Sequence, residues 1–564
     1  MKDFFKSNIE YITYAFLLIV YYILCFQKWD GTYIDTDNYF HIIKTIDFMN
    51  NLSLTDGKLM LTNYPFGEIW HWSRAFDIFM LFISIPFLCF LPIKDAVFYS
   101  AFWINPILLF LTFSVLFFFF KKNIDAKSRF LAFILLFVQA NFMRVFIVNR
   151  PDHHSMIMCL LALILINLFN VLIKGTKRYI LYLSLCCSLA LWVSPECFLM
   201  YICCLFCLFI AYMFFKFEYI NLISFASYSA LFTTLFWLIN PPYEGYFALL
   251  TGRLSFFYVI TFCYVALVLY VAQYIKGKIS RLFFLCCASL MILVLSYQEG
   301  LMNYPFHNSL IQVAFLDRVT ELKSGLSIYY LSYPLISLFL LILLFKKDFN
   351  NVWYYSLFIF FTVYLFISVK SMRFLPYLIL ISTLVIVQYI SCKKLNYSKF
   401  FSIVLLLCSI EYISFITQIL FIKDDAKQEN SSIPIYYIKQ LNLPQGSVVT
   451  DLFLTPFVIW YADRPTIASS FHGNIEGIVD NHKILFSSDE KEVVNLIKKH
   501  KVGSILFPLI ENDDFYISPE ENCDKLYAKI SKCNNYPNWL RKIHDENFYL
   551  YEVIQEKLNE SVKR

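Results

Sequence analysis

The chain has 564 residues, of which 59% are hydrophobic and only 16% are charged, and its mean hydropathy is +0.60. Soluble domains have about a quarter of their residues charged, so these values exclude a soluble protein and indicate one that crosses a membrane many times. The net charge of +6 is small and dispersed, which argues against nucleic acid as a partner.

Apolar runs long enough to cross a hydrocarbon core of roughly 30 Å predict about 13 transmembrane helices. The first, Ile9–Phe26, is interpreted as a span and not as a signal peptide, because no small-residue cleavage site follows it. The remaining spans are expected at Val97–Phe120, Arg129–Val148, Ser155–Ile173, Tyr179–Cys197, Leu199–Phe215, Tyr219–Ile239, Leu254–Ile275, Arg281–Tyr297, Ile328–Phe345, Val352–Val369, Arg373–Ser391 and Phe400–Ile422.

Basic clusters mark cytoplasmic loops and fix the expected topology. With Met1 inside, residues 27–96 form a first external loop, and residues 298–327 form a long external loop later in the chain. The apolar stretch Phe76–Ile93 contains two prolines, and a crossing there would put the basic cluster Lys121–Arg129 outside. We therefore predict a re-entrant or surface element. The Trp-rich stretch Tyr64–Asp77 is expected to lie along the outer interface as an aromatic belt.

Residues 1–422 are thus expected to form the membrane domain, and residues 423–564 an extracytoplasmic mixed α/β domain. Gly446–Ser469 predicts a strand, a turn, a helix and a strand, and Glu492–Pro508 predicts an amphipathic helix followed by a buried strand. The tail has two cysteines, Cys523 and Cys533. Extracytoplasmic placement would permit a disulfide between them, and the sequence leaves that question open.

Acidic residues and a histidine gather at the predicted external helix ends. Asp37, Asp152, His154 and Glu321 offer carboxylate oxygens and one imidazole, a set that suits Mn²⁺ or Mg²⁺. The alternative is that each is a solvated loop residue. Arg373 opens a predicted span, where its guanidinium could bind a lipid phosphate or serve as an interfacial anchor. Further candidates for contacts with donor or acceptor are His71, Arg74, His153 and Asp451.

The same stretches, in the same order, resemble the catalytic subunits of oligosaccharyltransferases, which belong to the GT-C class of membrane glycosyltransferases. "DNYFH" resembles the family's first acidic motif, and "DHH" its second in the archaeal form, whose first and third residues bind metal. "YPFGEIWHW" is similar to a stretch of the first external loop, "VTELKS" to the motif whose glutamate closes the metal site, and "RF" to the lipid-phosphate arginine. In this chain they are Asp37–His41, Asp152–His154, Tyr64–Trp72, Val319–Ser324 and Arg373–Phe374.

One departure concerns acceptor recognition. The family opens its external domain with Trp-Trp-Asp-Tyr-Gly, which recognises the Ser or Thr of the acceptor sequon. Here the flanks are similar, but the motif is replaced by "TDLFLTP" at Thr450–Pro456, in which Asp451 is a possible remnant. Glycosylation of Asn sequons therefore does not follow from the resemblance.

The resemblance implies a metal-dependent, inverting glycosyltransferase with a polyprenyl-(pyro)phosphate-linked donor, embedded in the inner or plasma membrane and acting on its periplasmic side. Asp37, Asp152, His154 and Glu321 would hold Mn²⁺ or Mg²⁺, Asp37 or Asp35 would orient or deprotonate the acceptor, and residues 298–327 would close over the donor. The acceptor is a protein, a lipid or a glycan.

Three alternatives remain open. The first is a polyprenyl-monophosphate-sugar transferase that modifies a lipid or surface polysaccharide. The second is a transporter or flippase of lipid-linked sugars, although the sequence lacks an inverted pair of Gly/Pro-broken helices. The third is a non-catalytic protein that binds polyprenyl lipids through Arg373.

Overall fold

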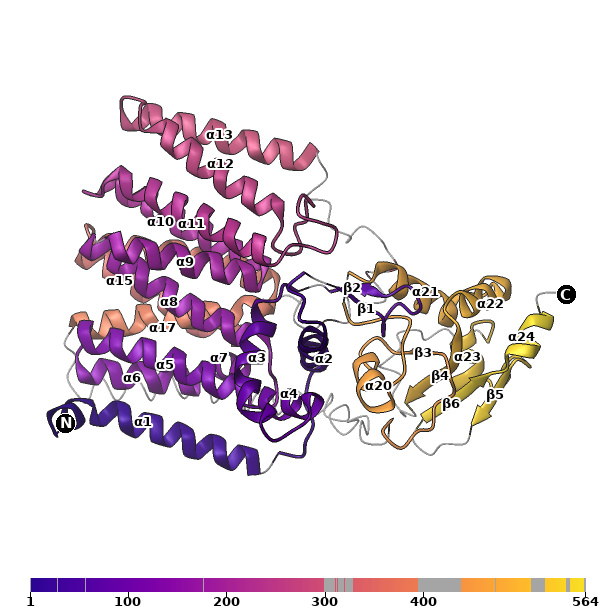
Figure 1. Ribbon diagram of the computed structural model, residues 1–564. Coiled ribbons are helices and arrows are strands. Elements are labelled where there is room, and N and C mark those ends of the chain that lie inside the picture. Colours follow the sequence, from indigo (N-terminus) through magenta and orange to yellow (C-terminus); the bar gives the residue numbers. More distant parts are fainter. Residues whose placement is uncertain are drawn as a thin grey trace.

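The structure is a computed structural model. It describes residues 2–27, 29–55, 57–70, 72–175, 177–298, 310, 312, 319, 328–393, 438–471, 473–508, 523–543 and 548–561. A bundle of long helices makes up most of the molecule, and a smaller sheet-containing region stands beyond one end of the bundle (Figure 1).

The bundle is built from apolar helices that run back and forth beside one another (Figure 1). They are α1 (Lys2–Gln27), α5 (Ile104–Asn123), α6 (Ala126–Val138), α8 (His153–Lys174), α9 (Lys177–Val193), α10 (Phe198–Phe214), α11 (Tyr219–Ile239), α12 (Phe256–Ala272), α13 (Lys278–Gln298), α15 (Ile328–Lys347), α16 (Val352–Lys370) and α17 (Leu375–Lys393). Short turns α7 (Ala140–Met143), η1 (Arg144–Phe146), η2 (Pro195–Cys197) and η6 (Met372–Phe374) lie at helix ends.

Six helices of the described part are long and apolar enough to cross a membrane, or eight if each of two bent pairs counts as one span. The chain is therefore an integral, polytopic membrane protein. The predicted total of 13 spans stays a prediction, and the expected span Phe400–Ile422 lies outside the described residues.

One of the bent pairs occupies the place of the predicted re-entrant element. Helix α3 (Ala75–Leu88) and helix α4 (Ile93–Ala101) meet at 115°. The backbone N–H of Arg74, just before α3, donates to Asn240, and Asn105, just after α4, donates to the carbonyl of Arg150. The pair thus begins and ends at the same end of the bundle, as a re-entrant element does.

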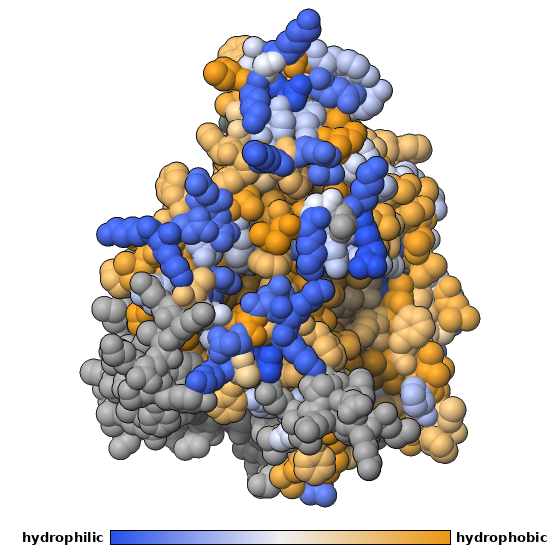
Figure 2. Space-filling view, turned by 90° about the vertical axis from the view of Figure 1, so that its left-hand side faces the viewer, coloured by the Kyte–Doolittle hydropathy of each residue, from blue (hydrophilic) through white to orange (hydrophobic). Residues whose placement is uncertain are grey.

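The two ends of the bundle differ in charge. Helix α8 begins at His153 beside the sheet-containing region and ends with Lys174 in its last turn, so that lysine lies at the opposite end. Basic residues also close α5 and α15. Figure 2 shows this opposite end, where hydrophilic side chains gather across the face and hydrophobic ones border it.

Helix α2 (Thr36–Asn51) lies between the bundle and the sheet-containing region, where the sequence predicted an external loop (Figure 1). A two-stranded hairpin, β1 (Lys58–Leu59) and β2 (Glu68–Ile69), follows it. The predicted aromatic belt in this loop is wrong: Trp70 and Trp72 are buried in a cluster with Phe40, Ile459 and Phe471. The loop turns its tryptophans toward the sheet-containing region because that region supplies apolar partners.

The C-terminal region has a four-stranded sheet in the order β3-β4-β6-β5. Strands β3 (Ser447–Thr450) and β4 (Val502–Pro508) are parallel, with Val449 opposite Ile505, whereas β6 (Phe548–Val553) pairs antiparallel with β4 and with β5 (Leu540–Ile543). Parallel neighbours require a crossover, and the chain supplies α20 (Thr455–Ala462), α21 (Ile475–Phe486) and α22 (Glu490–Lys499) there. The predicted helix and buried strand over Glu492–Pro508 are confirmed by α22 and β4, whereas the second strand predicted within Gly446–Ser469 is reduced to an isolated bridge between Val448 and Thr466.

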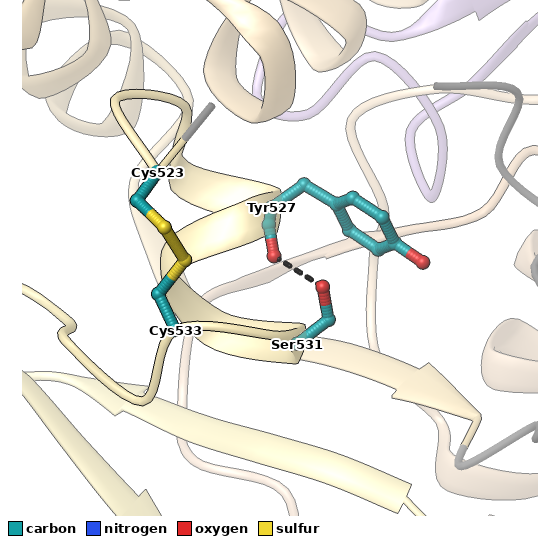
Figure 3. The surroundings of a disulfide bond; sticks show 4 residues. All are labelled: Cys523, Tyr527, Ser531 and Cys533. Atoms are coloured by element: carbon teal, nitrogen blue, oxygen red, sulfur yellow. Dashed lines mark hydrogen bonds between the residues drawn. A yellow bond between two sulfur atoms is a disulfide. The ribbon is translucent and has the colours of Figure 1, made fainter. Parts of the chain in front are cut away.

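Helices α23 (Leu526–Ser531) and α24 (Gln555–Ser561) complete this region. Cys523 and Cys533 form a disulfide that closes the loop around α23, with Cα atoms 6.1 Å apart (Figure 3). Within the loop, the Ser531 hydroxyl donates to the Tyr527 carbonyl at 2.8 Å. The pairing that the sequence left open is thus present in the structure.

The C-terminal region packs directly on α2. Tyr39 and Tyr461 join their hydroxyls at 2.8 Å, and Phe457 meets the ring of Tyr39 edge-on at 4.9 Å. His500 is fully buried beside the segment between α2 and α3, with Nδ1 2.7 Å from the Tyr64 carbonyl and Nε2 2.8 Å from Asp480. This segment and the C-terminal region are therefore held together by polar as well as apolar contacts.

Candidate active site

Helix α8 begins at the "DHH" motif. Asp152 has an extended backbone and stands at the N-cap, where its carboxylate accepts the backbone N–H of His154 at 3.4 Å. This is the usual way in which an aspartate satisfies the free N–H groups of a first turn. The cap fixes His153 and His154 as the first two helical residues, so both imidazoles are held at the mouth of the bundle.

Asp152 is buried among cationic and imidazole groups. Its Oδ1 lies 2.7 Å from His153 Nδ1 and 3.9 Å from His41 Nε2, and its Oδ2 lies 3.6 Å from Arg150, which also pairs with Asp35 at 3.2 Å. Burial alone would raise the pKa of Asp152, but His154, His153 and Arg150 outweigh it and hold the pKa well below the usual value. Asp152 is therefore a carboxylate at neutral pH.

A second set of contacts extends the site toward η2 and η6. His154 Nδ1 lies 2.8 Å from the Tyr377 hydroxyl and 3.6 Å from Glu196. Arg373 pairs with Glu196 at 3.2 Å and approaches His153 Nε2 at 3.5 Å. Arg373 is thus adjacent to the histidines while its side chain remains 29% exposed, open to a ligand.

His41 joins the site from α2. Its Nε2 is 3.2 Å from His153 Nδ1, and its ring stacks on Trp72 with centroids 4.1 Å apart. Burial, followed by the nearby His153, lowers the pKa of His41 well below its usual value. A neutral imidazole keeps a lone pair for a proton or a metal ion.

These side chains form two overlapping groups with metal-ligand character. His41, Asp152 and His153 make one, and His153, His154 and Glu196 make the other; within each, the ligand nitrogen and oxygen atoms lie within 4.8 Å of one another. The donor set, imidazole and carboxylate on rigid helix ends, fits a transition metal such as Mn²⁺ or Zn²⁺.

The structure brings some predicted residues together and leaves others apart. Asp152, His153, His154 and Arg373 converge, and Asp35 is linked to them through Arg150. Asp37, in the first turn of α2, belongs to neither metal-ligand group of the described residues. Glu321 and His71 lie outside the described residues.

Two further candidates have structural contacts. Arg74 is 1% exposed and pairs with Asp77 and Asp47, each at 3.4 Å. Asp451 is also buried, and its carboxylate accepts the backbone N–H of Phe453 in the turn before α20. Both residues stabilise loops that surround the site.

From the sequence, Glu196 is a candidate at an outer helix end, either functional or solvated, whereas His41 and Arg150 were given no role of their own in the site. His41 stands one helical turn after Asp37, so recognising α2 as a helix would have placed both on adjacent turns. Arg150 stands two residues before Asp152 in "NRPDHHS". Glu196 follows a proline at the end of an apolar run, a position typical of a helix boundary.

No protein-family model matches the sequence, and no curated protein matches it significantly. Solved structures do match, and they show that the fold is that of GT-C membrane glycosyltransferases.

The archaeal oligosaccharyltransferase AglB from Archaeoglobus fulgidus, solved with an inhibitory peptide and a dolichol-phosphate, matches with a TM-score of 0.65 and 13% identity, over 84% of this chain and 66% of that one. An Archaeoglobus fulgidus oligosaccharyltransferase solved in complex with Zn and sulfate matches with a TM-score of 0.61 and 14% identity, over 85% of this chain and 64% of that one. ArnT from Cupriavidus metallidurans, bound to undecaprenyl phosphate, matches at 0.50 and 9%, over 96% and 98%. The chain thus spans about two thirds of AglB.

Proposed function

We propose that this protein is a metal-dependent, inverting glycosyltransferase that uses a sugar linked to polyprenyl phosphate or pyrophosphate. The observation that carries the proposal is the buried cluster around Asp152, with Arg373 beside it, at the same end of a GT-C bundle. AglB and ArnT were solved with polyprenyl phosphates, which agrees with a lipid-linked donor.

We infer a divalent cation at this cluster, held by one of two overlapping sets that share His153: His41, Asp152 and His153, or His153, His154 and Glu196. Among the ion-paired residues of the cluster, the three carboxylates Asp35, Asp152 and Glu196 face two guanidinium groups, Arg150 and Arg373, which leaves one negative charge for a cation to balance. The imidazoles favour Mn²⁺ over Mg²⁺, and Asp37 and Glu321 remain proposed ligands. When bound, such an ion supplies Lewis-acid stabilisation of phosphate oxygens.

Arg373 is the proposed phosphate-binding residue. Glu196 and His153 hold its guanidinium at the mouth of the bundle, where a phosphate oxygen can replace the solvent that reaches it. A planar guanidinium matches two phosphate oxygens, so it would orient the leaving group and neutralise its charge. The anomeric carbon would then face the acceptor side of the site.

The acceptor side would be formed by α2 and the C-terminal region. Ser470 donates to Thr36 at 3.5 Å, so the segment after α20 borders the turn that carries Asp35 and Asp37. Either carboxylate would orient the acceptor hydroxyl or amide and take its proton. An acceptor protein, lipid or glycan would enter between these two elements.

A polyprenyl-monophosphate donor and a lipid or polysaccharide acceptor form the second candidate. One specific observation favours it: ArnT and this chain match over 98% and 96% of their lengths, whereas AglB extends well beyond the match. The replaced sequon motif at Thr450–Pro456 agrees with it as well.

We infer that the site and the C-terminal region are extracytoplasmic. The basic last turns of α8 and α15 lie away from the site, as cytoplasmic loops do. The Cys523–Cys533 disulfide supports the same orientation, since disulfides persist in oxidising compartments.

The test is transfer by the purified full-length protein in vesicles, with polyprenyl-phosphate and polyprenyl-pyrophosphate sugars offered separately. EDTA should abolish transfer, and Mn²⁺ should restore it.

Asp152→Asn should lower the affinity for Mn²⁺ about tenfold or more, and Arg373→Ala should raise the KM for the donor by a similar factor. The matched control is Arg541→Ala, which removes an arginine that forms an exposed ion pair with Glu552 in the C-terminal sheet. Full activity in EDTA would exclude the metal, and no transfer from either donor would exclude the proposal.

A further inference from the structure

The segment between α11 and α12 displays apolar side chains to the outside. Phe247 is 77% exposed, and Tyr243, Tyr246 and Leu249 are 44–46% exposed. We call these four residues the apolar rim. Large exposed apolar side chains that lie close together mark a site of interaction, so we expect the apolar rim to contact another molecule.

The backbone that carries the apolar rim is held firmly at both ends. At one end Asn240 is buried, accepts from Arg74 and Trp192, and donates to the Leu54 carbonyl at 2.7 Å. At the other end the Ser255 hydroxyl donates to the Leu250 carbonyl at 2.6 Å. The rings are therefore displayed by a fixed loop.

The apolar rim continues the hydrophobic flank of the bundle. Leu235, Leu238 and Ile239 at the end of α11 are 43–49% exposed, and α11 is one of the helices that can cross a membrane. Ile260 in α12 is 46% exposed on the other side of the rim. The exposed flank of α11 is thus followed, after the buried residues Asn240–Pro242, by the exposed side chains of the rim.

Polar groups at the edge of the rim suit a headgroup region. The ammonium of Lys58 lies over the Tyr243 ring at 5.5 Å, and the Tyr246 hydroxyl lies 3.5 Å from the Leu238 carbonyl. Aromatic rings with a polar tip, next to a cation, are the side chains that concentrate at the membrane–water boundary.

We propose that the apolar rim inserts into the headgroup–acyl boundary of the leaflet on the side of the candidate active site, with phospholipid as its occupant. The inference rests on exposure, backbone anchoring and the exposed flank of α11, and it holds whether or not the protein transfers sugars. The rim would fix how deeply the mouth of the bundle sits in that leaflet.

The test uses the full-length protein with p-benzoylphenylalanine in place of Phe247, reconstituted in phosphatidylethanolamine–phosphatidylglycerol vesicles that contain an alkyne-tailed phospholipid. After irradiation, mass spectrometry of the labelled peptide should show the phospholipid adduct. The matched control carries the same photoprobe at Phe66, which is 46% exposed but packs beside His500 in the C-terminal region. We expect about tenfold more lipid adduct at position 247.

Equal lipid labelling at both positions would overturn the proposal. So would an adduct at position 247 that joins another segment of this chain or a second copy. The same probe in place of Tyr243 provides an independent variant if the first is poorly expressed, and the same two outcomes decide it.

Discussion

Near the site, a lysine and an aspartate form a buried ion pair, and burial of such charges carries a large desolvation cost. Lys44 and Asp77 are at most 1% exposed and lie 3.3 Å apart, with Arg74 also on Asp77 at 3.4 Å. Burial lowers the pKa of Lys44 to about 7, against the opposing effect of Asp77. The carboxylate thus keeps the lysine cationic below about pH 7, although burial favours the neutral amine.

Asp77→Asn should destabilise the protein strongly. Lys44 would lose its carboxylate partner in a dry environment, at a cost of about 3 kcal/mol in unfolding free energy. Raising the pH should reduce the loss, because the amine can then release its proton. Unfolding in detergent measures it, with Asp47→Asn as the control, since Asp47 is 25% exposed. Equal losses in the two variants would contradict this account.

Glu68 should make stability depend on pH. It is buried at β2, and among the described residues no donor reaches either carboxylate oxygen with good hydrogen-bond geometry. Burial raises its pKa to about 7, and the nearby polar groups of Ser469, Thr62 and Asn474 offset this only in part. The folded state therefore holds a proton that the unfolded state releases near pH 4.5, so stability falls as pH rises from about 4.5 to 7.

Glu68→Gln removes this titration. At pH 8 the variant should be more stable than the natural protein by about 3 kcal/mol, the equivalent of a shift of roughly 2.5 pKa units. Below pH 4.5 the two proteins should unfold alike. Thermal unfolding across this range decides the matter, and a pH-independent difference would count against a buried protonated Glu68.

The residues of the site show what sequence reasoning can reach. Asp152, His154 and Arg373 were predictable because they stand in motifs at helix mouths. The sequence left Glu196 open between a functional and a solvated residue and assigned His41 no role of its own, since their places in the site come from contacts 3.6 Å from His154 and 3.2 Å from His153. Such pairings depend on how the helices pack, and a single sequence carries no direct sign of that.

At the level of elements, hydrophobic length predicted the bundle well. The predicted Tyr219–Ile239 is α11 itself, and Ser155–Ile173 differs from α8 by two residues at its start and one at its end. Helix α2 was missed because its polar residues resemble a loop. Ten of its 16 residues are nevertheless buried, since the bundle and the C-terminal region cover it from two sides.

The parallel pairing of β3 and β4 should depend on a glycine. A Cβ on Gly503, the second residue of β4, would lie 1.9 Å from the Gln445 carbonyl oxygen, a contact no relaxation of a side chain can relieve. Gly503→Ala should therefore cost about 3 kcal/mol or more, an overpacking penalty at the high end. Gly473→Ala, where nothing lies within 4 Å, is the control. Similar stability of the two variants would refute the close approach.

At the scale of the whole molecule, the sequence predicted a membrane bundle followed by an α/β region, and the structure has both. The way they meet was not predictable, because Trp70, Trp72 and Phe471 form a shared core between segments about 400 residues apart. Because these tryptophans are buried in that core, they do not form the aromatic belt that the sequence predicted. Three exposed aromatic residues, Tyr243, Tyr246 and Phe247, lie in the segment between α11 and α12.

The disulfide should stabilise the C-terminal region. Replacing Cys523 and Cys533 together by Ser frees a loop with a sequence separation of 10, and closure of so short a loop is worth about 2–3 kcal/mol. Limited proteolysis under non-reducing conditions should cut the variant faster near α23. The natural protein treated with a reductant should behave like the variant, and unchanged protection in both would contradict the prediction.

The hydroxyl contact between Tyr39 and Tyr461 spans 422 residues of chain, and it has a consequence for biosynthesis. A nascent chain emerges N-terminus first, so α2 enters the membrane surface long before its partner α20 has been translated. The carboxylates of α2 reach their final setting only when α20 has been made. Chains that end before α20 would thus have an inserted bundle but an unfinished candidate site.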